Sequence, residues 1–354
     1  MRAACVKFGA PSCTIGSLAE PIVSVVVPTL RAGPELLDCV YSLDRQTQPG
    51  VEIIVVDNSG RGLVRQSAAA RLATRLIENE TNLGFGAAVN AGFRASRAPY
   101  LATINDDAVA HPQWLERLIQ AMDSQDRVGM CASQIRLAGQ NRLDSAGMLV
   151  SGDGSSKQRG QFESPARFAR REEVLLPSAC AALYRRAMLD EIGLFDEEFF
   201  LYCEDTDLGL RARWAGWKCL YVPDAVVEHA YSSSAGQASP LKAYYVERNR
   251  LFVLLKNYPA DMLWRAPFFT VARYFWHLLA LSRNERLAGQ FHAAGRPPIE
   301  LAYLAARAHV ALLFHLPRLW RQRKKIRQTA RLSPREFRQL LRAHWISPRQ
   351  VAAL

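Results

Sequence analysis

The chain has 354 residues, of which 49% are hydrophobic and 22% charged, as is typical of a globular protein with one to three folded units. Its net charge of +12 is unevenly distributed. Residues 1–247 contain 25 basic and 29 acidic residues, a net charge of −4, whereas residues 248–354 contain 20 basic and 4 acidic residues, a net charge of +16. The asymmetry indicates two units that face different surroundings, and the acidic front argues against a nucleic-acid-binding protein.

The seven cysteines are scattered, odd in number and form no CxxC pair, which argues against a disulfide framework and a zinc knuckle and fits a reducing cytosol. Residues 1–20 lack a continuous apolar stretch, so no signal peptide is expected. No uncharged apolar run reaches the roughly 18 residues of a membrane-spanning helix, so no clear spanning helix is expected.

Strand-like and helix-like patterns alternate over the first 130 residues. The β-branched runs IVSVVV (22–27) and VEIIVV (51–56) read as buried strands. Further strands are expected at 74–77 and 100–104, and helices at 34–46, 61–73, 84–96 and from about Pro112. This alternation predicts an α/β fold with a mostly parallel, doubly wound sheet, in which ligands bind at the carboxyl ends of the strands.

The later segments are less regular. Residues 138–173 are rich in Gly, Ser and charge and are expected to form a mobile loop between short strands. Helices are expected at 185–192 and 205–215, and a strand at 217–222. After Tyr244 the pattern is helical to the end, with breaks expected at Pro259, Pro267, Pro297, Pro298, Pro317 and Pro334.

Three of the expected strands end in polar clusters, which should converge along one edge of the sheet. The clusters are Pro28-Thr29, Asp57-Asn58-Ser59 and Asn105-Asp106-Asp107. Adjacent carboxylates are ligands for a hard cation such as Mg²⁺, which completes its shell with substrate phosphates; a solvated turn that caps the next helix is the alternative. A carboxylate at the second strand end could accept from a nucleotide base or ribose, or close an Asx-turn.

The stretch Asn82-Leu83-Gly84-Phe85-Gly86 opens a helix with glycines, which lets the backbone approach a phosphate or a sugar. It is not a GxGxxG motif and lacks the lysine of a P-loop. A helix start that packs on the sheet is the alternative interpretation.

The stretch FFLYCEDTDLGLR (199–211) places Glu204, Asp205 and Asp207 directly behind an apolar, aromatic lead-in. Acids in a first helical turn gain roughly 0.3–1 kcal/mol each from the helix dipole, so capping explains acids in general. A buried lead-in would also place them at the floor of a pocket, where desolvation raises the pKa of a carboxylate toward that of a general base. Both interpretations can hold together.

Six stretches, in this order, resemble the family 2 glycosyltransferases with a GT-A fold, over about residues 22–257. They are VSVVVPTL, VEIIVVDNSG, ENETNLGFGAAVNAGFRAS, YLATINDDA, LPSACAALYRRAMLDEIGLFDEEFFLYCEDTDLGLRARWAGW and VVEHAYSSS. The chain looks closest to the bacterial branch of rhamnosyl- and galactofuranosyltransferases of cell-surface polysaccharides. The resemblance implies a Rossmann-like GT-A fold, a nucleotide diphospho-sugar donor such as dTDP-rhamnose, and a divalent cation, Mg²⁺ or Mn²⁺.

The resemblance also implies roles for individual residues. The base and ribose would be lined by Pro28, Thr29 and Asp57, and the nucleotide sugar would lie near Asn82, Gly84 and Phe85. The DxD-type element would be Asn105-Asp106-Asp107, with Asp106 on the ribose or the metal. The metal that bridges the diphosphate would be held by Asp107 and by His229, where some relatives have a metal-binding histidine; a structural histidine is the alternative for His229.

The family inverts the anomeric centre in a single displacement, so it needs one general base and no covalent carboxylate pair. The resemblance assigns the base to Asp205. Glu204 would be a neighbour that tunes the base or contacts the acceptor, and Asp207 would be a helix-start residue.

The basic tail contains two aromatic, apolar stretches interrupted by arginine, residues 262–282 and 301–316, followed by RLWRQRKKIRQTAR (318–331) with seven basic residues and no acid. Amphipathic helices of this kind lie in the membrane interface, and a polybasic run is attracted to anionic headgroups. The alternatives are a helical bundle packed on the catalytic domain, with a solvated basic edge, and nucleic-acid binding by the run.

These patterns predict an N-terminal extension (1–20), a GT-A catalytic domain (21–257, nucleotide-sugar half 21–130 and acceptor half 131–257) and a helical, basic, membrane-associating region (258–354). The expected function is inverting, metal-dependent transfer of a sugar to a lipid-linked or polysaccharide acceptor in cell-surface glycan biosynthesis. The protein would be peripheral on the cytoplasmic face of an anionic membrane, without a nucleic-acid partner. The alternatives are a transferase using UDP-galactose, UDP-galactofuranose or another hexosyl donor, and an inactive GT-A scaffold. No pattern indicates an oligomeric state.

Overall fold

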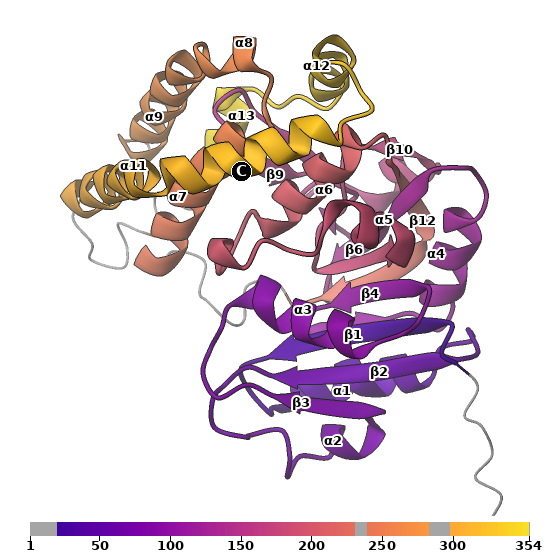
Figure 1. The fold of residues 1–354 in the computed structure, drawn as a ribbon. Helices are drawn as coiled ribbons and strands as arrows, with labels where there is room; N and C mark the ends of the chain where they lie inside the picture. The colour runs from indigo at the N-terminus through magenta and orange to yellow at the C-terminus, as the bar shows by residue number, and fades with distance from the viewer. Residues whose placement is uncertain (1–19, 231–238, 283–297, 354) are drawn as a thin grey trace, which may run out of the picture.

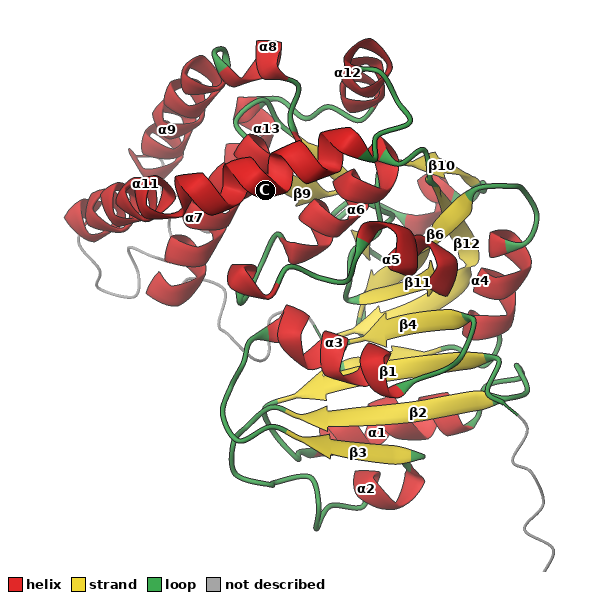
Figure 2. Ribbon diagram, viewed as in Figure 1, coloured by secondary structure: helices red, strands yellow, loops and turns green. Residues whose placement is uncertain are grey.

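The computed structural model describes residues 20–230, 239–282 and 298–353. Among these residues, ten strands form one sheet, with helices on both of its faces and a further group of helices beyond one end (Figures 1 and 2). In spatial order the main strands are β10 (Glu172–Val174), β12 (Lys218–His229), β6 (Val128–Leu137), β11 (Ala181–Arg185), β4 (Tyr100–Ile104), β1 (Val23–Thr29), β2 (Val51–Asp57) and β3 (Arg75–Glu78).

The four strands at one end of the sheet are parallel, as predicted: β1 pairs with β2 on one side and β4 on the other, and β2 pairs with β3. Val23, Val25 and Val27 pack with helices α1 (Pro34–Asp44) and α4 (Trp114–Met122), whereas Val26 packs with α3 (Phe85–Ala95) on the opposite face. Because both faces are covered, these strands are continuous β-branched runs rather than alternating ones.

The other half of the sheet is mixed. Strand β11 is antiparallel to both β4 and β6, and β6 is parallel to β12. The short strands β5 (Ala108–Ala110) and β7 (Leu143–Ser145) are antiparallel to β12 and β6, and β8 (Met148–Val150) and β9 (Ser156–Gln158) form a separate antiparallel pair. Helices α5 (Arg186–Ile192) and α6 (Glu204–Trp214) cover the same face as α3.

The C-terminal helices pack on the outer side of α6. They are α7 (Pro240–Asn257), α8 (Ala260–Leu263), α9 (Ala266–Ser282), α11 (Pro298–Gln328), α12 (Pro334–Ala343) and α13 (Pro348–Ala353). The ring of Trp214 stacks on Phe337 of α12 with centroids 3.8 Å apart, and the Arg327 guanidinium lies over Trp214 at 3.5 Å. A continuous apolar cluster therefore joins α7, α8, α11 and α12 to β8 and α6.

Two predicted elements differ from the structure. The helix expected at 61–73 is wrong: only α2 (Ala69–Leu72) is helical, because Gly60 and Gly62 have positive φ and the chain turns so that Val64 N donates to the Asp57 carboxylate at 2.9 Å. The break expected at Pro317 is also wrong, since α11 runs through it. Pro259, Pro267, Pro298 and Pro334 lie at helix starts, and Pro297 lies outside the described residues.

Residues 138–173 are not a mobile loop. They contain β7, β8, β9, β10 and a short 3₁₀ helix, η1 (Pro165–Phe168), and their polar residues Asp144, Ser145 and Asp153 are buried. The Gly- and Ser-rich composition is used for tight turns between very short strands, so it is a poor indicator of mobility in this segment.

Helices α9 and α11 expose apolar side chains on their outer sides. The largest are Phe268, Val271, Phe275, Leu278, Ile299, Tyr303, Leu313, Phe314 and Trp320. Although no clear spanning helix was expected, Ile299–Gln328 is long and apolar enough to cross a membrane by length and composition, which alone is weak evidence. Only 11% of its most apolar stretch is buried, so this apolar surface is not used inside the described protein.

Candidate active site

Asp107 and His229 meet where β4 and β12 end. The Asp107 carbonyl accepts from Ala230 N at 3.0 Å, and Asp107 Oδ1 lies 3.2 Å from His229 Nε2. Nδ1 of His229 lies 2.9 Å from Asp144 Oδ2, on β7. Burial lowers the pKa of His229, but the neighbouring Cys180, Asp107 and Asp144 together hold that pKa well above its ordinary value.

This arrangement can hold a hard cation only with help. Within the described residues no group of three or more His, Cys, Asp and Glu side chains is arranged to bind a metal ion. Because Asp144 engages Nδ1, His229 can present Nε2 as a ligand beside Asp107, the arrangement in which a carboxylate orients a metal-bound imidazole. The pair therefore fits a cation whose remaining ligands come from substrate phosphates and water.

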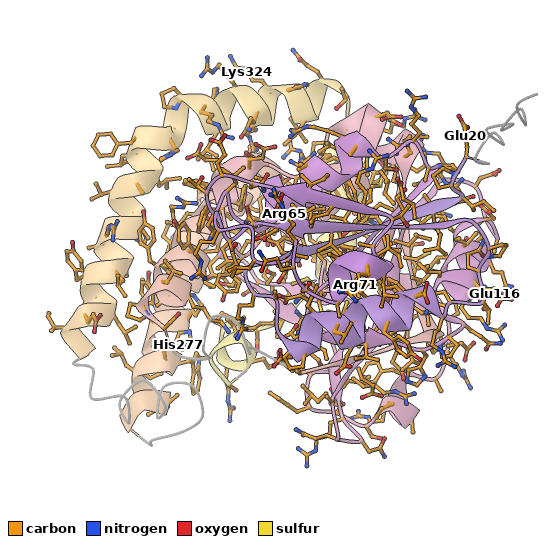
Figure 3. All side chains as sticks on the ribbon, turned by 90° about the horizontal axis from the view of Figure 1, so that it is seen from below. Glu20, Arg65, Arg71, Glu116, His277 and Lys324 are labelled. Atoms are coloured by element: carbon orange, nitrogen blue, oxygen red, sulfur yellow. The ribbon has the colours of Figure 1, made fainter. Side chains whose placement is uncertain are left out.

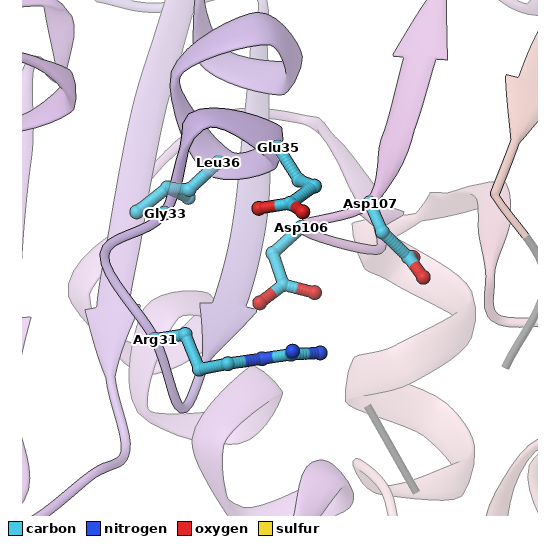
Figure 4. Close-up of a pocket in the computed structure, with 6 residues that line it drawn as sticks. All are labelled: Arg31, Gly33, Glu35, Leu36, Asp106 and Asp107. Atoms are coloured by element: carbon cyan, nitrogen blue, oxygen red, sulfur yellow. The ribbon is translucent and has the colours of Figure 1, made fainter. Parts of the chain in front are cut away.

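Asp106 points a different way from Asp107. Figure 4 shows its carboxylate turned toward Arg31, with Glu35 on the opposite side of Asp106 and Asp107 pointing in another direction. Thr29 Oγ1 donates to Asp106 Oδ2 at 2.6 Å, which ties the first strand end to the third. Burial, followed by the charge of Asp107, raises the pKa of Asp106, although the Thr29 hydrogen bond opposes this. The two acids of the N-x-D element thus belong to different surroundings.

The carboxylate of Asp57 is already used by its own loop. Its two oxygens accept from the backbone N–H groups of Ser59 and Val64, both at 2.9 Å. Burial opposes these hydrogen bonds, which nevertheless lower the pKa of Asp57. The Asx-turn alternative is therefore present in the structure, and a nucleotide base or ribose would have to share these oxygens. Pro28 lies one residue before the end of β1, opposite Val56.

The glycine-led helix start contacts the stretch FFLYCEDTDLGLR (199–211), called the acid segment below. Asn82 Oδ1 accepts from Gly84 N at 2.9 Å and from Asn58 Nδ2 at 3.0 Å. The Phe85 N–H donates to the carbonyl of Phe200 at 2.7 Å. At Gly84, where φ is +86°, a Cβ atom would lie 2.3 Å from that same carbonyl oxygen, so only glycine allows the two loops to approach.

The aromatic lead-in is a strained loop rather than a strand. Phe200, Tyr202 and Cys203 all have φ between 62° and 69°, a conformation that costs non-glycine residues of order 1–3 kcal/mol each. Asn249 of α7 holds it, because its Nδ2 lies 2.8 Å from each of three backbone carbonyls in residues 199–202. The adjacent Arg248 also donates to the Phe199 carbonyl, which it shares with Asn249, and to one further carbonyl, that of Glu198.

The three acids that follow have different surroundings. Glu204 is 6% exposed, and its Oε2 has no hydrogen-bond partner in the described part of the chain. Burial, and then the charge of Asp205, raises the pKa of Glu204 to about 8. Asp205 accepts from Thr206 N at 2.7 Å and Ala179 N at 3.3 Å, and burial still raises its pKa against these hydrogen bonds.

Asp207 is different, because it lies in a buried ion network. Lys256 Nζ, Arg211 Nε and Asn257 Nδ2 lie 2.8–2.9 Å from its two oxygens. Burial opposes ionisation, but Lys256 and Arg211 lower the pKa of Asp207. Asp207 is in the first turn of α6, as predicted, and it joins that helix to α7 rather than facing a pocket.

The fold and family follow from known proteins. Residues 24–193 match the description "Glycosyl transferase family 2". The chain is 31% identical over 272 residues to the N-acetylglucosaminyl-diphospho-decaprenol L-rhamnosyltransferase of Mycobacterium tuberculosis, covering 70% of this chain and 87% of the relative. The chain belongs to glycosyl transferase family 2, in its rhamnosyltransferase-like branch. It is also 29% identical to the uncharacterized glycosyltransferase YwdF of Bacillus subtilis, covering 61% of this chain and 77% of the relative.

The fold of this family 2 glycosyltransferase is also that of solved enzymes. The structure of GalNAc-T7 with UDP, GalNAc and Mn²⁺ superposes with a TM-score of 0.56 at 17% identity, over 70% of this chain and 49% of that one. The predicted α/β class and GT-A fold, with a helical C-terminal region, are therefore confirmed. The roles of individual residues are not tested by this similarity and stay predictions.

Two residues of this glycosyltransferase's site were missed in the sequence. Asp144 lies in the segment expected to be mobile, and Asn249 lies in the middle of a long helix. An asparagine inside a helix between two arginines (RNR, 248–250) is an unfavourable choice there, and that could have indicated a buried backbone contact. The sequence contains no comparable sign for Asp144.

Proposed function

We propose that this glycosyltransferase moves L-rhamnose from a nucleotide diphospho-sugar, with dTDP-rhamnose as the expected donor, to a sugar carried on a polyprenyl diphosphate. The single observation that carries the proposal is the pairing of two separate acid groups at one edge of the sheet. Asp107 with His229 fits a cation and diphosphate, and Asp205 with Glu204 fits an acceptor hydroxyl. The relative's printed name, an N-acetylglucosaminyl-diphospho-decaprenol L-rhamnosyltransferase, supports the choice of sugar and acceptor.

The transfer would be a single displacement with inversion. The acceptor oxygen attacks the anomeric carbon and gives its proton to the Asp205 carboxylate, while the bond from that carbon to the leaving diphosphate breaks. The Ala179 and Thr206 N–H groups orient Asp205, and its buried surroundings favour proton uptake. Asp107 and His229 would hold a Mg²⁺ or Mn²⁺ ion, which when bound supplies charge neutralisation to the diphosphate.

Membrane association is part of the proposal. The exposed apolar sides of α9 and α11 support contact with the cytoplasmic face of the membrane, where a polyprenyl acceptor would lie. The basic run is only partly available for lipid: Arg321, Lys324 and Lys325 are exposed, whereas Arg323 donates to the carbonyls of Leu255 and Tyr258. The inner side of these helices therefore packs on the rest of the protein, as the bundle alternative expects, and their outer side is available for the proposed membrane contact. Figure 3 shows Lys324 on this helical side and Glu116 on the sheet side.

The test is a panel of nucleotide sugars assayed with GlcNAc-diphospho-farnesol as acceptor, with and without Mn²⁺. We expect transfer from dTDP-rhamnose, dependent on the divalent ion and giving an inverted linkage by NMR. Preferred transfer from UDP-galactose or UDP-galactofuranose would replace the donor assignment. Absence of transfer and of nucleotide-sugar binding across the panel would favour the inactive scaffold.

For the membrane, the triple variant Arg321→Glu, Lys324→Glu, Lys325→Glu changes only exposed charges. We expect weaker binding to vesicles containing phosphatidylglycerol, since each basic residue near an anionic surface contributes about 1 kcal/mol. Binding equal to that of the unchanged protein would remove the electrostatic part of the proposal.

A further inference from the structure

Two lysines beside the acid segment lack, within the described residues, the carboxylate partner that the nearby buried cations Arg273 and Lys256 have. Arg273 is ion-paired with Asp153 at 2.5 Å and with Glu247 at 2.8 Å, and Lys256 is paired with Asp207 at 2.8 Å. Lys157 on β9 and Lys242 on α7 are partly buried, yet within the described residues neither ammonium group lies in an ion pair. A cation in such a place favours an anionic ligand.

Both lysines adjoin the site. Ser156, next to Lys157 on β9, lies with its Oγ 2.9 Å from Thr206 Oγ1, directly after Asp205. Because side chains alternate along a strand, Lys157 projects from the opposite side of β9, where burial and then the charges of Lys242 and Arg273 lower its pKa and Cys203, in the strained loop, opposes them. Lys242 Nζ lies 5.6 Å from the ring centre of Tyr202, inside the strained loop.

The two lysines also connect the candidate metal pair with helix α9. On one side Lys242 is near enough to Asp144, the partner of His229, for the Asp144 charge to act on it. On the other side Lys157 acts on Arg273 and His277 of α9. Figure 3 shows His277 on the helical side of the molecule. The outer surface of the same helix exposes Phe268 and Phe275.

Positive charges repel one another around Lys157 and Lys242 when no ligand is bound. Burial, and then the charges of Lys242 and Arg273, lower the pKa of Lys157 to about 8. Burial, followed by Arg273 and Lys157, lowers the pKa of His277 to about 4. A diphosphate bound between the lysines would remove the repulsion that these shifts record.

We propose that Lys157 and Lys242 bind the diphosphate of the lipid-linked acceptor, with its sugar toward Asp205 and its polyprenyl chain toward the apolar side of α9. The inference rests on the proposed function and adds the subsite that selects a diphosphate-linked acceptor. The acceptor is favoured over the donor because the donor's diphosphate is expected at Asp107 and His229, whereas the contacts of the lysine region are with the acid segment: Ser156 beside Lys157 contacts Thr206, and Lys242 lies 5.6 Å from the Tyr202 ring.

The experiment compares two acceptors in detergent micelles: GlcNAc-diphospho-farnesol, and octyl N-acetylglucosaminide, which lacks the diphosphate. For Lys157→Gln and Lys242→Gln we expect the KM for the diphosphate acceptor to rise about tenfold to a hundredfold, as for a lost charge-assisted hydrogen bond. The KM for the donor and the kinetics with the octyl glycoside should change less than twofold. Lys157→Arg should retain most of the affinity, because it keeps the charge.

Lys218→Gln is the matched control, since Lys218 begins the strand that ends at His229 and so lies far from the site. An equal KM rise for both acceptors, or a rise in the donor KM alone, would overturn the proposal. Failure of the proposed function looks different: the unchanged protein would then use neither acceptor. In that case calorimetric titration with farnesyl diphosphate still decides, since binding insensitive to both substitutions contradicts the lysine subsite.

Discussion

The nucleotide-side loops and the acid segment lie along the same edge of the sheet but are held in different ways. Asp57 accepts hydrogen bonds within its own loop, and Asn82 accepts from Gly84 in its own loop and from Asn58, 24 positions away. The acid segment takes a strained backbone and is held by Asn249, 47 to 50 positions away, on a helix of the C-terminal group. The loops around Asp57 and Asn82 are thus held by residues near them in the sequence, whereas the acid segment takes its conformation only once α7 has packed against it.

The most direct test of the acid segment is Asp205→Asn, which keeps the size of the side chain and removes its basicity. We expect kcat to fall about 10²- to 10⁴-fold, the range for loss of a general base, with donor binding within threefold. Steady-state kinetics and nucleotide titration measure the two.

Glu204→Gln serves as the paired variant for that assignment. If Glu204→Gln abolishes turnover and Asp205→Asn does not, Asp205 is not the general base and Glu204 takes that role.

Asn249→Ala tests whether α7 positions the acceptor side. It leaves three backbone carbonyls of the strained loop without their donor, and we expect a loss of about 2–4 kcal/mol of unfolding free energy and a ten- to hundredfold lower kcat. The donor KM should change much less than kcat, because the hydrogen bonds that fix Asp57 and Asn82 do not involve Asn249.

Leu341→Ala is a matched control, because it removes a fully buried side chain of the C-terminal cluster and costs similar stability. If Leu341→Ala lowers kcat as much as Asn249→Ala does, general destabilisation rather than positioning accounts for the loss.

The same contrast explains what the sequence could and could not predict. The β-branched runs of β1 and β2 are local patterns, so the parallel half of the sheet and the strand-end clusters were predicted correctly. The sequence also predicted that Asp207 lies at the start of a helix and differs in role from Glu204 and Asp205. It did not predict that Lys256 would form an ion pair with Asp207. Asp144 and Asn249 act through residues 85 and about 50 positions away, and no local pattern identifies these partners, although the RNR stretch could have marked Asn249 as unusual.

Asp144→Asn tests the proposed metal pair, because the contact between Asp144 and His229 Nδ1 is the long-range support of a site otherwise made from strand ends. The substitution keeps an oxygen near His229 Nδ1 but removes its charge. We expect Mn²⁺ affinity in the presence of donor to fall about tenfold, at the lower end of the effects seen for such supporting carboxylates. Asp224→Asn, an exposed acid on the same strand as His229, should leave the Mn²⁺ titration unchanged.

Gly84→Ala tests the point where the two sides touch. The new Cβ would lie 2.3 Å from the Phe200 carbonyl oxygen, at a positive φ. Gly139 also has positive φ but has nothing within 4 Å of a Cβ, so Gly139→Ala is the matched control for backbone strain alone. We expect Gly84→Ala to be less stable than Gly139→Ala by about 2 kcal/mol, measured by urea denaturation. Equal losses would mean that the loops can separate without cost.

The pH dependence of stability gives the smallest expected effect. Glu204 has a folded-state pKa of about 8, above its ordinary 4.5, mainly because of burial. Between these two values the folded protein binds a proton that the unfolded chain has released, so the unfolding free energy falls as pH rises, by about 1 kcal/mol per pH unit. Glu204→Gln cannot titrate and should lose this contribution, so its stability relative to the unchanged protein should increase from pH 6 to pH 8. Because His229 and the more distant titrating groups are common to both proteins, the difference reports Glu204 together with Asp205, whose charge contributes to the Glu204 pKa. If the difference in unfolding free energy does not change with pH, Glu204 is not kept protonated in the folded protein. Burial would then not raise the pKa of this acid, and the acid segment would resemble the loop around Asp57 in this respect.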